Sequence, residues 1–439
     1  MAQGVHNGIG DVKFPEYQQF VSRIGARSKN SAIRDTFDEG CGQKNVNMVA
    51  GLPNPKLFPI LSTEITLKDG TTVKIDEQTQ EDGLQYQSTW GMPEMIDWLI
   101  DLQRRVHNPP TLGREDHPGQ MELMIIAGCQ DGISTCFRIL LNEGDTLLIQ
   151  NPSYPTMFNM VESIGCTPVG IDSDEHGISA SKMRTLLENW ETSNPVNKNA
   201  PRPKVLYCIP TGENPRSASW SFERRQAVYQ ICREFNLLIM EDDPYYFTYF
   251  NRPLPRSMLS IDVDGRVLRF DSFSKVMCPG FRLGCMSGPR PVMMKMLAIY
   301  MSTTAQASAV SQMTLMAILK KWGYEGFMHQ CDRVSQFLKQ NASYFVDAAT
   351  IYLSDVAEWT IPDSGMFLWL RFKDCMDATD IMKKCDQQGL SVLGGFNATA
   401  GKPASPYVRI AYALSTKEEI IEACKIMARV AKEERNACK

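Results

Sequence analysis

Short apolar runs alternate with amphipathic stretches of helical period through the middle of the chain. Runs rich in β-branched and other apolar residues predict strands, and they occupy residues 121–127, 147–150, 205–209, 237–240 and 267–270. Apolar residues at helical spacing predict a helix that starts at Pro93, one after the glycine turn at 128–132, and one that starts at Ser221. This alternation indicates βαβ units and a mainly parallel sheet in an α/β fold.

The pattern changes beyond about residue 335. Helical spacing predicts a long helix around 305–340 and another around 378–388, and apolar runs predict strands at 358–361, 366–372 and 407–413. Ser415 and Glu418 match a capping box ahead of a final helix. The buried face of that helix is expected to carry Ile420, Cys424, Met427 and Ala431. We therefore expect a smaller α+β domain in this part of the chain.

These patterns suggest a division of the chain. Residues 1–52 are expected to form an N-terminal arm and part of the small domain, residues 53–335 the large domain, and residues 336–439 the C-terminal small domain. The proline-rich stretch AGLPNP supplies the turns that mark the start of the large domain. An amphipathic stretch at 17–24 predicts an arm or short helix that packs on the larger body.

Composition excludes several classes of protein. The net charge of -4 offers no basic surface for nucleic acid. The 13 cysteines include no C-x-x-C pair and the 5 histidines show no ligand spacing, so we expect neither a metal site nor a disulfide framework. Reduced thiols and an N-terminus without a signal or transit pattern predict a cytoplasmic protein. The chain holds no apolar run long enough to span a membrane.

The stretch from residue 271 to residue 284, DSFSKVMCPGFRLG, places a lysine among hydroxyl groups at the end of a predicted strand. Lys275 can form a Schiff base with an aldehyde. Ser272, Ser274 and Arg282 are the residue types that bind a phosphate. An aldehyde and a phosphate on one small molecule indicate pyridoxal phosphate (PLP). The alternatives are a solvated loop lysine and the S-x-x-K signature of serine acyl-transfer enzymes, for which the chain offers no S-D-N or K-T-G partner.

Candidate binding residues follow other predicted strands, where ligands sit in open α/β sheets. The turn at Gly128 presents the backbone N–H groups of a helix start to a phosphate. A buried carboxylate must keep the pyridine nitrogen of PLP protonated, and Asp242 suits that role, with Asp243 or Glu241 as alternatives if the register slips. Other candidates are Asn214 and Tyr245 for the ring oxygen, Tyr154 for stacking and Arg409 for a substrate carboxylate. Each could instead have a structural role. Tyr154 and Tyr245 could be core aromatics, Asn214 a turn former, Asp242 a helix or turn cap, and Arg409 part of a surface ion pair.

Taken in order, these motifs resemble the fold-type I PLP-dependent aminotransferases. The likeness is greatest to the kynurenine/α-aminoadipate aminotransferases and the fungal aromatic aminotransferases, and it runs from about Ile33 to the C-terminus. It rests on the stretches AGLPNP, LQYQSTWGMPE, HNPPT, PTGENP, EDDPYYF, VDGRV, DSFSK with GFRLG, GMFLWL and SPYVR. The resemblance implies a mainly parallel seven-stranded sheet flanked by helices, with a smaller α+β domain.

The resemblance also implies roles for individual residues. Lys275 would carry PLP, Asp242 would pair with the ring nitrogen, Asn214 and Tyr245 would hold the ring oxygen, and Tyr154 would stack. The phosphate would be held by Gly128, Cys129, Gln130, Ser272, Ser274 and Arg282. Arg409 would bind the substrate carboxylate. A homodimer with shared active sites would bring Tyr86 of one subunit to the phosphate of the other, Arg34 and Gly51 would cover the substrate, and Phe367 would line an apolar pocket.

The chain departs from the family pattern at several points. Cys129 replaces the usual serine of the phosphate site, which should weaken phosphate binding modestly. Val49 precedes Ala50 and Gly51 where relatives have AGG, and Arg216 and Ser217 replace the usual Thr-Gly after Asn-Pro. Met277, Cys278 and Pro279 replace small residues after Lys275. These changes remove no catalytic group, but they leave the choice of substrate open.

The reaction implied is a ping-pong transamination. The donor would be an aromatic amino acid, kynurenine or α-aminoadipate, the acceptor 2-oxoglutarate, and Lys275 the base that moves the proton. A β-lyase or decarboxylase on the same scaffold is an alternative, because the cofactor parts are shared. A regulator with an aminotransferase-like domain is a further alternative, but it would need a basic helix-turn-helix domain ahead of the fold.

Overall fold

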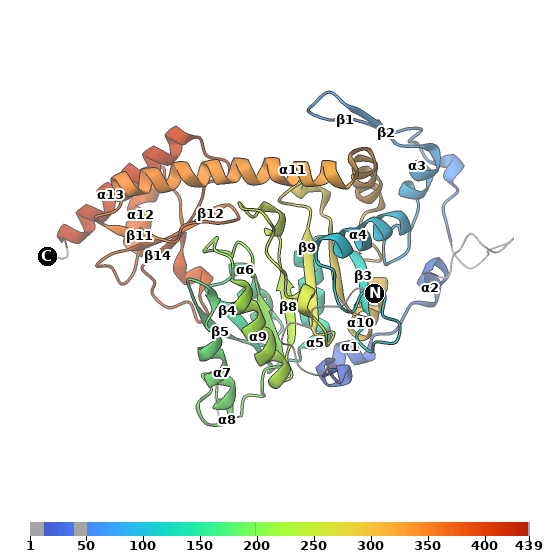
Figure 1. The fold of residues 1–439 in the computed structure, drawn as a ribbon, viewed down its shortest axis with the longest axis horizontal. Helices are drawn as coiled ribbons and strands as arrows, with labels where there is room; N and C mark the ends of the chain where they lie inside the picture. Colours follow the sequence, from blue (N-terminus) through green and yellow to red (C-terminus); the bar gives the residue numbers. More distant parts are fainter. Residues whose placement is uncertain (1–12, 39–50, 198, 438–439) are drawn as a thin grey trace, which may run out of the picture.

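The computed structural model describes residues 13–38, 51–197 and 199–437. Its centre is an eight-stranded sheet (Figure 1). In spatial order the strands are β3 (Met121–Ile126), β10 (Gly284–Pro289), β9 (Val267–Ser272), β8 (Leu238–Asp242), β7 (Val205–Cys208), β4 (Thr146–Asn151), β5 (Thr167–Asp174) and β6 (Gly177–Ile178). The five strands predicted between residues 121 and 270 all belong to this sheet, while β5, β6 and β10 were not anticipated individually.

Most neighbouring strands of the large sheet are parallel, as the alternating pattern predicts. Strands β9, β8, β7, β4 and β5 form the parallel part. Strand β10 is antiparallel to both β9 and β3. The seven-stranded sheet implied by the family resemblance gains an eighth strand, the two-residue β6, which pairs antiparallel with the end of β5.

Helices cover both faces of the large sheet, so the side chains that alternate between the two faces are buried on either side. In β7, Val205 and Tyr207 join the core under α5, α6 and α10, whereas Leu206 and Cys208 join the core under α7 and α9. Helix α4 covers β3 on that second side. The helices of the large domain are α4 (Pro93–Val106), α5 (Cys129–Leu140), α6 (Pro155–Ser163), α7 (Ala180–Glu188), α8 (Trp190–Ser193), α9 (Phe222–Glu234) and α10 (Arg290–Ser302). The helices predicted from Pro93 and after Ser221 are confirmed.

The second sheet is antiparallel, with the order β11 (Ala357–Trp359), β12 (Phe367–Phe372), β14 (Tyr407–Ala411) and β13 (Leu393–Gly394). Helices α12 (Thr379–Gln387) and α13 (Lys417–Ala437) pack on it with the C-terminal part of α11 (Ala309–Tyr352). Helix α11 reaches from the large sheet to the small one (Figure 1), and its backbone leaves helical geometry at Gly323 (φ 64°). The predicted α+β character is therefore confirmed, while the exact domain borders stay a prediction.

The capping box of α13 differs from the prediction by one residue. Thr416 and Glu419 cap the helix reciprocally: the Thr416 N–H donates to Glu419 Oε2 (2.8 Å) and the Glu419 N–H donates to Thr416 Oγ1 (3.2 Å). Ser415 instead belongs to the preceding turn, where its N–H donates to the Tyr412 carbonyl (3.3 Å). The predicted buried face is correct, because Ile420, Cys424, Met427 and Ala431 are all buried.

The N-terminal segment packs on the large domain, as its amphipathic pattern predicts. The Tyr17 hydroxyl donates to the Gly265 carbonyl (2.7 Å), and the Ser22 hydroxyl donates to the Arg138 carbonyl (2.6 Å). The elements of this part are η1 (Tyr17–Phe20), α1 (Arg23–Arg27), α2 (Ala32–Asp38), η2 (Pro55–Leu57), β1 (Glu64–Thr66), β2 (Thr72–Lys74) and α3 (Glu77–Leu84).

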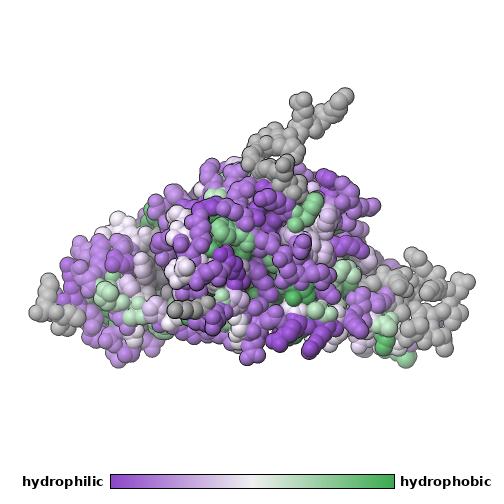
Figure 2. All heavy atoms as spheres, turned by 90° about the horizontal axis from the view of Figure 1, so that it is seen from below, coloured by the Kyte–Doolittle hydropathy of each residue, from purple (hydrophilic) through white to green (hydrophobic). Residues whose placement is uncertain are grey.

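Polar residues cover most of the face shown in Figure 2, and apolar residues appear there in smaller groups. Over the described ranges, no helix is long and apolar enough to cross a membrane. The same ranges contain no cluster of three or more metal-ligating side chains.

Candidate active site

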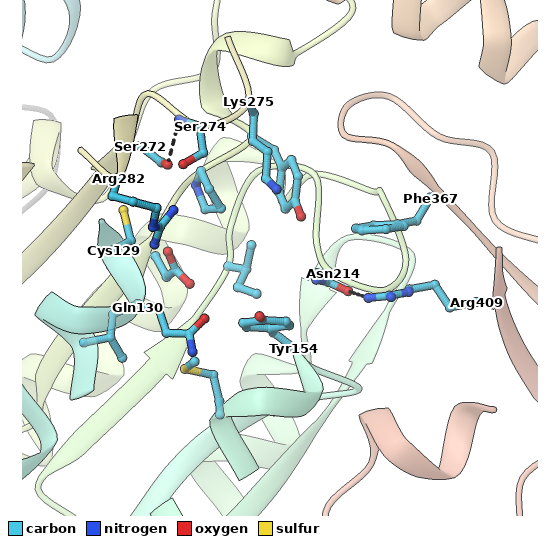
Figure 3. A pocket seen from close by; sticks show the side chains of 16 residues that line it. Cys129, Gln130, Tyr154, Asn214, Ser272, Ser274, Lys275, Arg282, Phe367 and Arg409 are labelled. Atoms are coloured by element: carbon cyan, nitrogen blue, oxygen red, sulfur yellow. Dashed lines mark hydrogen bonds between the residues drawn. The ribbon is translucent and has the colours of Figure 1, made fainter. Parts of the chain in front are cut away.

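A cavity of about 280 Å³ opens where β4, β7, β8 and β9 end. Because these strands are parallel, the loops that follow them meet at one edge of the sheet. Twelve of the predicted site residues line the cavity. They are Cys129, Gln130, Tyr154, Asn214, Asp242, Tyr245, Ser272, Ser274, Lys275, Arg282, Phe367 and Arg409. In Figure 3, Lys275 points into the space between a group around Arg282 and a group around Arg409.

The group around Arg282 is suited to an anion. Helix α5 begins at Cys129, so the positive end of its dipole faces the cavity. Gly128 precedes it with a positive φ of 87°, and a Cβ atom there would lie 2.5 Å from Arg282 Nη2. Only glycine therefore fits at this position without displacing the guanidinium. The Ser274 N–H donates to Ser272 Oγ (3.2 Å), which orders the two hydroxyl residues.

The environment of Lys275 makes its amine less basic than that of a solvated lysine. Burial lowers the pKa of Lys275, the Asp242 carboxylate opposes that shift, and the Arg282 guanidinium adds to it. The Lys275 Nζ lies 5.9 Å from the centroid of the Tyr245 ring. A neutral amine can act as a nucleophile or a base, which a solvated loop lysine does poorly at neutral pH.

Asp242 is the carboxylate that faces the cavity. Burial raises the pKa of Asp242 to about 7, although the hydrogen bond from Tyr207 opposes the shift. The alternatives Glu241 and Asp243 lie outside the cavity lining, and both pair with Arg269, at 3.2 and 2.9 Å. Because side chains alternate along β8, only Asp242 shares the cavity face of the sheet.

The small domain supplies the opposite end of the cavity. Arg409 on β14 donates through Nη1 to Asn214 Oδ1 (2.9 Å), and its guanidinium carbon lies 4.2 Å from the centroid of the Phe367 ring. Phe367 meets Tyr245 edge to face, with ring centroids 6.1 Å apart. A planar cation beside an amide and aromatic rings can bind a carboxylate that carries an apolar side chain.

Comparison with known proteins identifies the family of the chain. Residues 61–427 match the family model described as aminotransferase class I and II. The chain belongs to this aminotransferase family. A mouse protein named kynurenine/alpha-aminoadipate aminotransferase, mitochondrial, is 34% identical over 95% of this chain and 99% of its own length. The aminotransferase tdiD of Emericella nidulans is 31% identical over 97% of both chains.

Solved structures show the same fold. The aminotransferase Aro8 of Candida albicans has a TM-score of 0.85 at 22% identity, covering 97% of this chain and 100% of that chain. A kynurenine aminotransferase of Pyrococcus horikoshii has a TM-score of 0.74 at 22% identity, covering 95% of this chain and 98% of its own. That structure is described as a complex with PMP, the amino form of the cofactor. With the family match, the chain is a PLP-dependent aminotransferase.

The cavity of this aminotransferase fits PLP. One end combines a helix N-terminus, two hydroxyl residues and Arg282, which are donors suited to a phosphate. A buried carboxylate oxygen, Asp242 Oδ1, has no hydrogen-bond partner among the described residues. An unpaired buried acceptor of this kind is costly unless a ligand donates to it, and a protonated ring nitrogen is such a donor.

Four predicted residues of the aminotransferase are not part of the cavity lining. Gly128 adjoins it, directly before Cys129, whereas Arg34, Gly51 and Tyr86 lie apart from it. Arg34 Cζ is 5.1 Å from the centroid of the Tyr86 ring. Gly51 is exposed, and a Cβ atom there would meet nothing within 4 Å. The role predicted for Tyr86 requires a second subunit, and the roles predicted for Arg34 and Gly51 require that their segment covers the bound substrate. Positions 49 and 50, where the chain departs from its relatives, lie outside the described residues.

Four further residues of the lining, which are mainly apolar, were not predicted from the sequence. Ile133, Met157, Ile209 and Pro244 also border the cavity. Ile209 continues the alternation of Val205 and Tyr207 towards the helix α5 side, so its orientation could have been expected from the strand period. Pro244 follows Asp242 and Asp243 directly, and its only signal was the motif EDDPYY.

Proposed function

We propose that this aminotransferase moves the amino group of an aromatic amino acid, kynurenine or α-aminoadipate to a 2-oxo acid in a ping-pong reaction, with 2-oxoglutarate as the acceptor. The observation that carries the proposal is the placement of Lys275 between a phosphate-binding end and the Arg409–Asn214 pair. The names of the mouse and other relatives support this range of donors.

An aromatic donor is favoured over α-aminoadipate. The cations in the described lining are Lys275, Arg282 and Arg409, and each already has a proposed role, as the reacting amine, the phosphate ligand and the α-carboxylate ligand respectively. A second side-chain carboxylate would need another cation, because a buried unpaired charge is costly. Aromatic side chains of the lining offer apolar faces instead. Arg34, which lies near Tyr86, is the candidate for a second carboxylate if the N-terminal segment closes over the site.

The proposed binding of PLP uses residues of the cavity lining and the adjoining Gly128. Gly128, Cys129, Gln130, Ser272, Ser274 and Arg282 hold the phosphate, Asp242 holds the ring nitrogen, Asn214 and Tyr245 hold the ring oxygen, and Tyr154 covers a ring face. When bound, PLP supplies an electron sink that stabilises negative charge at the α-carbon of the amino acid. The protein determines which bond of the α-carbon reacts through the way it orients the substrate.

Side chains of the protein bind the substrate, move its proton and exclude water. Arg409 binds the α-carboxylate and thereby fixes the orientation of the α-carbon. The Lys275 amine, whose pKa is lowered by burial, takes the α-proton of the substrate onto Nζ and holds it beside the reacting carbon. Phe367, Tyr245 and Ile209 keep water away from that proton.

The proposal includes a homodimer with shared active sites. Tyr86 is 51% exposed, and the apolar residues Leu52 and Val310 near it are exposed as well. Exposed apolar surface of this kind is typical of protein interfaces. Light scattering of the purified protein should give twice the monomer mass. A monomer that is fully active would contradict the shared site.

We also propose a cytoplasmic location for the enzyme. The proposal rests on cysteine usage, because the 13 cysteines include no C-x-x-C pair and suggest reduced thiols. Three relatives carry the word mitochondrial in their names, so the two locations must be compared directly. Cell fractionation tests the proposal, and recovery of the enzyme with mitochondria would contradict it.

The first test of the reaction is absorbance spectroscopy of the protein reconstituted with PLP. Kynurenine, α-aminoadipate, tyrosine and phenylalanine are added separately, and loss of the lysine-bound cofactor band that 2-oxoglutarate restores identifies the donor. Lys275→Ala should lack the band, and Lys320→Ala is the control because Lys320 forms an exposed ion pair with Glu94. A band that persists in Lys275→Ala would contradict the role of Lys275. Release of ammonia or carbon dioxide in place of a 2-oxo acid would contradict transamination.

A further inference from the structure

Tyr207 lies beneath the cavity of the aminotransferase and contacts Asp242. It is fully buried in the centre of β7, and its hydroxyl donates to Asp242 Oδ2 at 2.6 Å. Phe137 of helix α5 supports its ring, with the two ring centroids 6.2 Å apart. Neither the sequence motifs nor the lining of the cavity includes this tyrosine.

The two oxygens of Asp242 therefore have different surroundings. Oδ2 accepts the Tyr207 hydrogen bond, whereas Oδ1 has no hydrogen-bond partner in the described part of the chain. A carboxylate fixed through one oxygen cannot rotate freely, so the other oxygen stays available to the cavity. The interaction of Tyr207 with Asp242 thus selects which oxygen the ligand meets.

We propose that Tyr207 is a positioning residue that keeps Asp242 ionised and oriented, with Oδ1 directed to the ring nitrogen of PLP. The inference rests on the proposed role of Asp242. A hydrogen bond to the charged form of an acid favours that form. An ionised Asp242 in turn favours the protonated ring nitrogen, on which the electron sink depends.

Tyr207 stays protonated at physiological pH and can therefore donate to the Asp242 carboxylate. Burial and the nearby Asp242 carboxylate raise the pKa of the Tyr207 phenol well above its ordinary value, so it keeps its proton. Other ionisable or charged groups also influence Asp242 from the surrounding elements. They are Asp243, which directly follows Asp242 in the chain, Arg269 on β9, Lys275 in the loop after β9, Cys129 on α5 and Tyr245 after β8.

The charged groups below the sheet form a separate network. Arg269 pairs with Glu241, Asp243 and Asp271. The Asp242 carboxylate takes no part in those ion pairs, and the Tyr207 hydroxyl is its hydrogen-bond donor within the described structure. Removing this hydroxyl should therefore affect Asp242 while the network around Arg269 keeps its contacts.

The test measures binding of PLP to the full-length apoprotein, with Tyr207→Phe compared to wild type. The second ligand is 1-deazapyridoxal phosphate, in which a carbon atom replaces the ring nitrogen. We expect Tyr207→Phe to weaken PLP about tenfold, the effect of one lost hydrogen bond to a charged group, and to leave the affinity for the deaza compound unchanged. The loss of PLP affinity at low pH should also begin at a higher pH in the variant, because its Asp242 protonates more readily.

The control is Tyr229→Phe. Tyr229 is also fully buried and its hydroxyl donates to an aspartate, Asp262, at 3.0 Å, but it lies outside the cavity. The Tyr229→Phe substitution should lower the melting temperature without changing the dissociation constant of PLP or of the deaza compound. If Tyr207→Phe fails to fold, 3-fluorotyrosine at position 207 provides a second variant, since its more acidic hydroxyl should tighten PLP and leave the deaza compound unchanged.

The outcomes separate this inference from the proposed function. Equal weakening of PLP and the deaza compound, or no weakening of either, would overturn the role of Tyr207. If the wild type binds both ligands equally and Asp242→Asn changes neither, the proposed role of Asp242 fails, and the inference fails with it. A third outcome is that Asp242→Asn no longer binds PLP more tightly than the deaza compound, whereas Tyr207→Phe still does so to the same extent as the wild type. That result would leave the proposed function standing and refute only the inference.

Discussion

Arg409 and Asn214 are hydrogen bonded across the two sheets of the protein, with Arg409 Nη1 2.9 Å from Asn214 Oδ1. Arg409 lies on β14 of the small sheet, and Asn214 lies in the turn after β7 of the large sheet. The bond links the residue proposed to bind the substrate carboxylate with a residue proposed to bind the cofactor. Substrate binding and cofactor orientation are therefore joined in one contact.

Replacement of Arg409 by lysine should weaken substrate binding and leave the cofactor in place. Lysine keeps the charge but loses the planar fork that can contact a carboxylate and Asn214 together. We expect KM for both the amino acid and the 2-oxo acid to rise about 10- to 100-fold, in line with the loss of about 1.5 to 3 kcal/mol for hydrogen bonds to charged groups. Steady-state kinetics and the cofactor absorbance check this. Arg371→Lys, in an exposed ion pair on the same sheet, is the control. Unchanged KM values would contradict the role of Arg409.

Gly128→Ala should reduce the affinity for PLP. The added methyl group would lie 2.5 Å from Arg282 Nη2, at a backbone φ of 87° that L-residues rarely adopt. The phosphate site would have to shift, and we expect the PLP dissociation constant of the apoprotein to rise at least about tenfold. Gly144→Ala is the matched control, because Gly144 has a φ of 86° with nothing within 4 Å of the added Cβ. Equal losses in both variants would point to backbone strain alone.

Cys129→Ser should strengthen phosphate binding. A hydroxyl is a stronger donor than a thiol, and a single hydrogen bond is worth about 0.5 to 1.5 kcal/mol. We therefore expect PLP to bind about 2- to 10-fold more tightly. Pyridoxal, which has no phosphate, should bind both proteins equally well. Cys129→Ala should resemble the natural protein, and a tighter complex in Cys129→Ala would show that size, not hydrogen bonding, matters at this position.

Asp242→Asn should stabilise the apoprotein at high pH. Burial raises the pKa of Asp242 to about 7 in the folded protein, whereas an unfolded chain has the ordinary lower value. The contribution of Asp242 to stability is therefore fully present below the unfolded pKa and is lost as pH rises through about 7. Asparagine carries no charge and keeps an acceptor for Tyr207. We expect it to raise the free energy of unfolding by about 1 to 4 kcal/mol at pH 8, and by little near pH 4.

Urea unfolding of both apoproteins at the two pH values measures this difference. With saturating PLP the order should reverse, because the cofactor stabilises only the protein whose ionised Asp242 pairs with its ring nitrogen. A gain that is the same at both pH values would mean that the ionisation of Asp242 does not limit stability.

The repeating βαβ order, the start of α4 and the residues that follow each parallel strand could all be predicted from the amino-acid sequence. These features depend on local spacing: apolar periodicity fixes the type of element, and the ends of parallel strands fix where polar residues gather. Twelve of the predicted site residues line one cavity, and three of them, Cys129, Gln130 and Phe367, were expected from the family resemblance and not from the spacing. Lys275 and Arg282 could be recognised because their chemistry is carried by a short continuous stretch.

The neighbours that those residues meet could not be predicted in this way, because they depend on tertiary packing. The choice of Asp242 over Glu241 and Asp243 depends on which face of β8 looks towards α5, and a slip of one residue would reverse it. The same limit applies to the capping box, where both Ser415 and Thr416 match the pattern and the preceding turn uses Ser415. The hydrogen bonds of Tyr207 with Asp242 and of Arg409 with Asn214 join residues far apart in sequence. Such contacts arise from the packing of whole elements, and no local pattern encodes them.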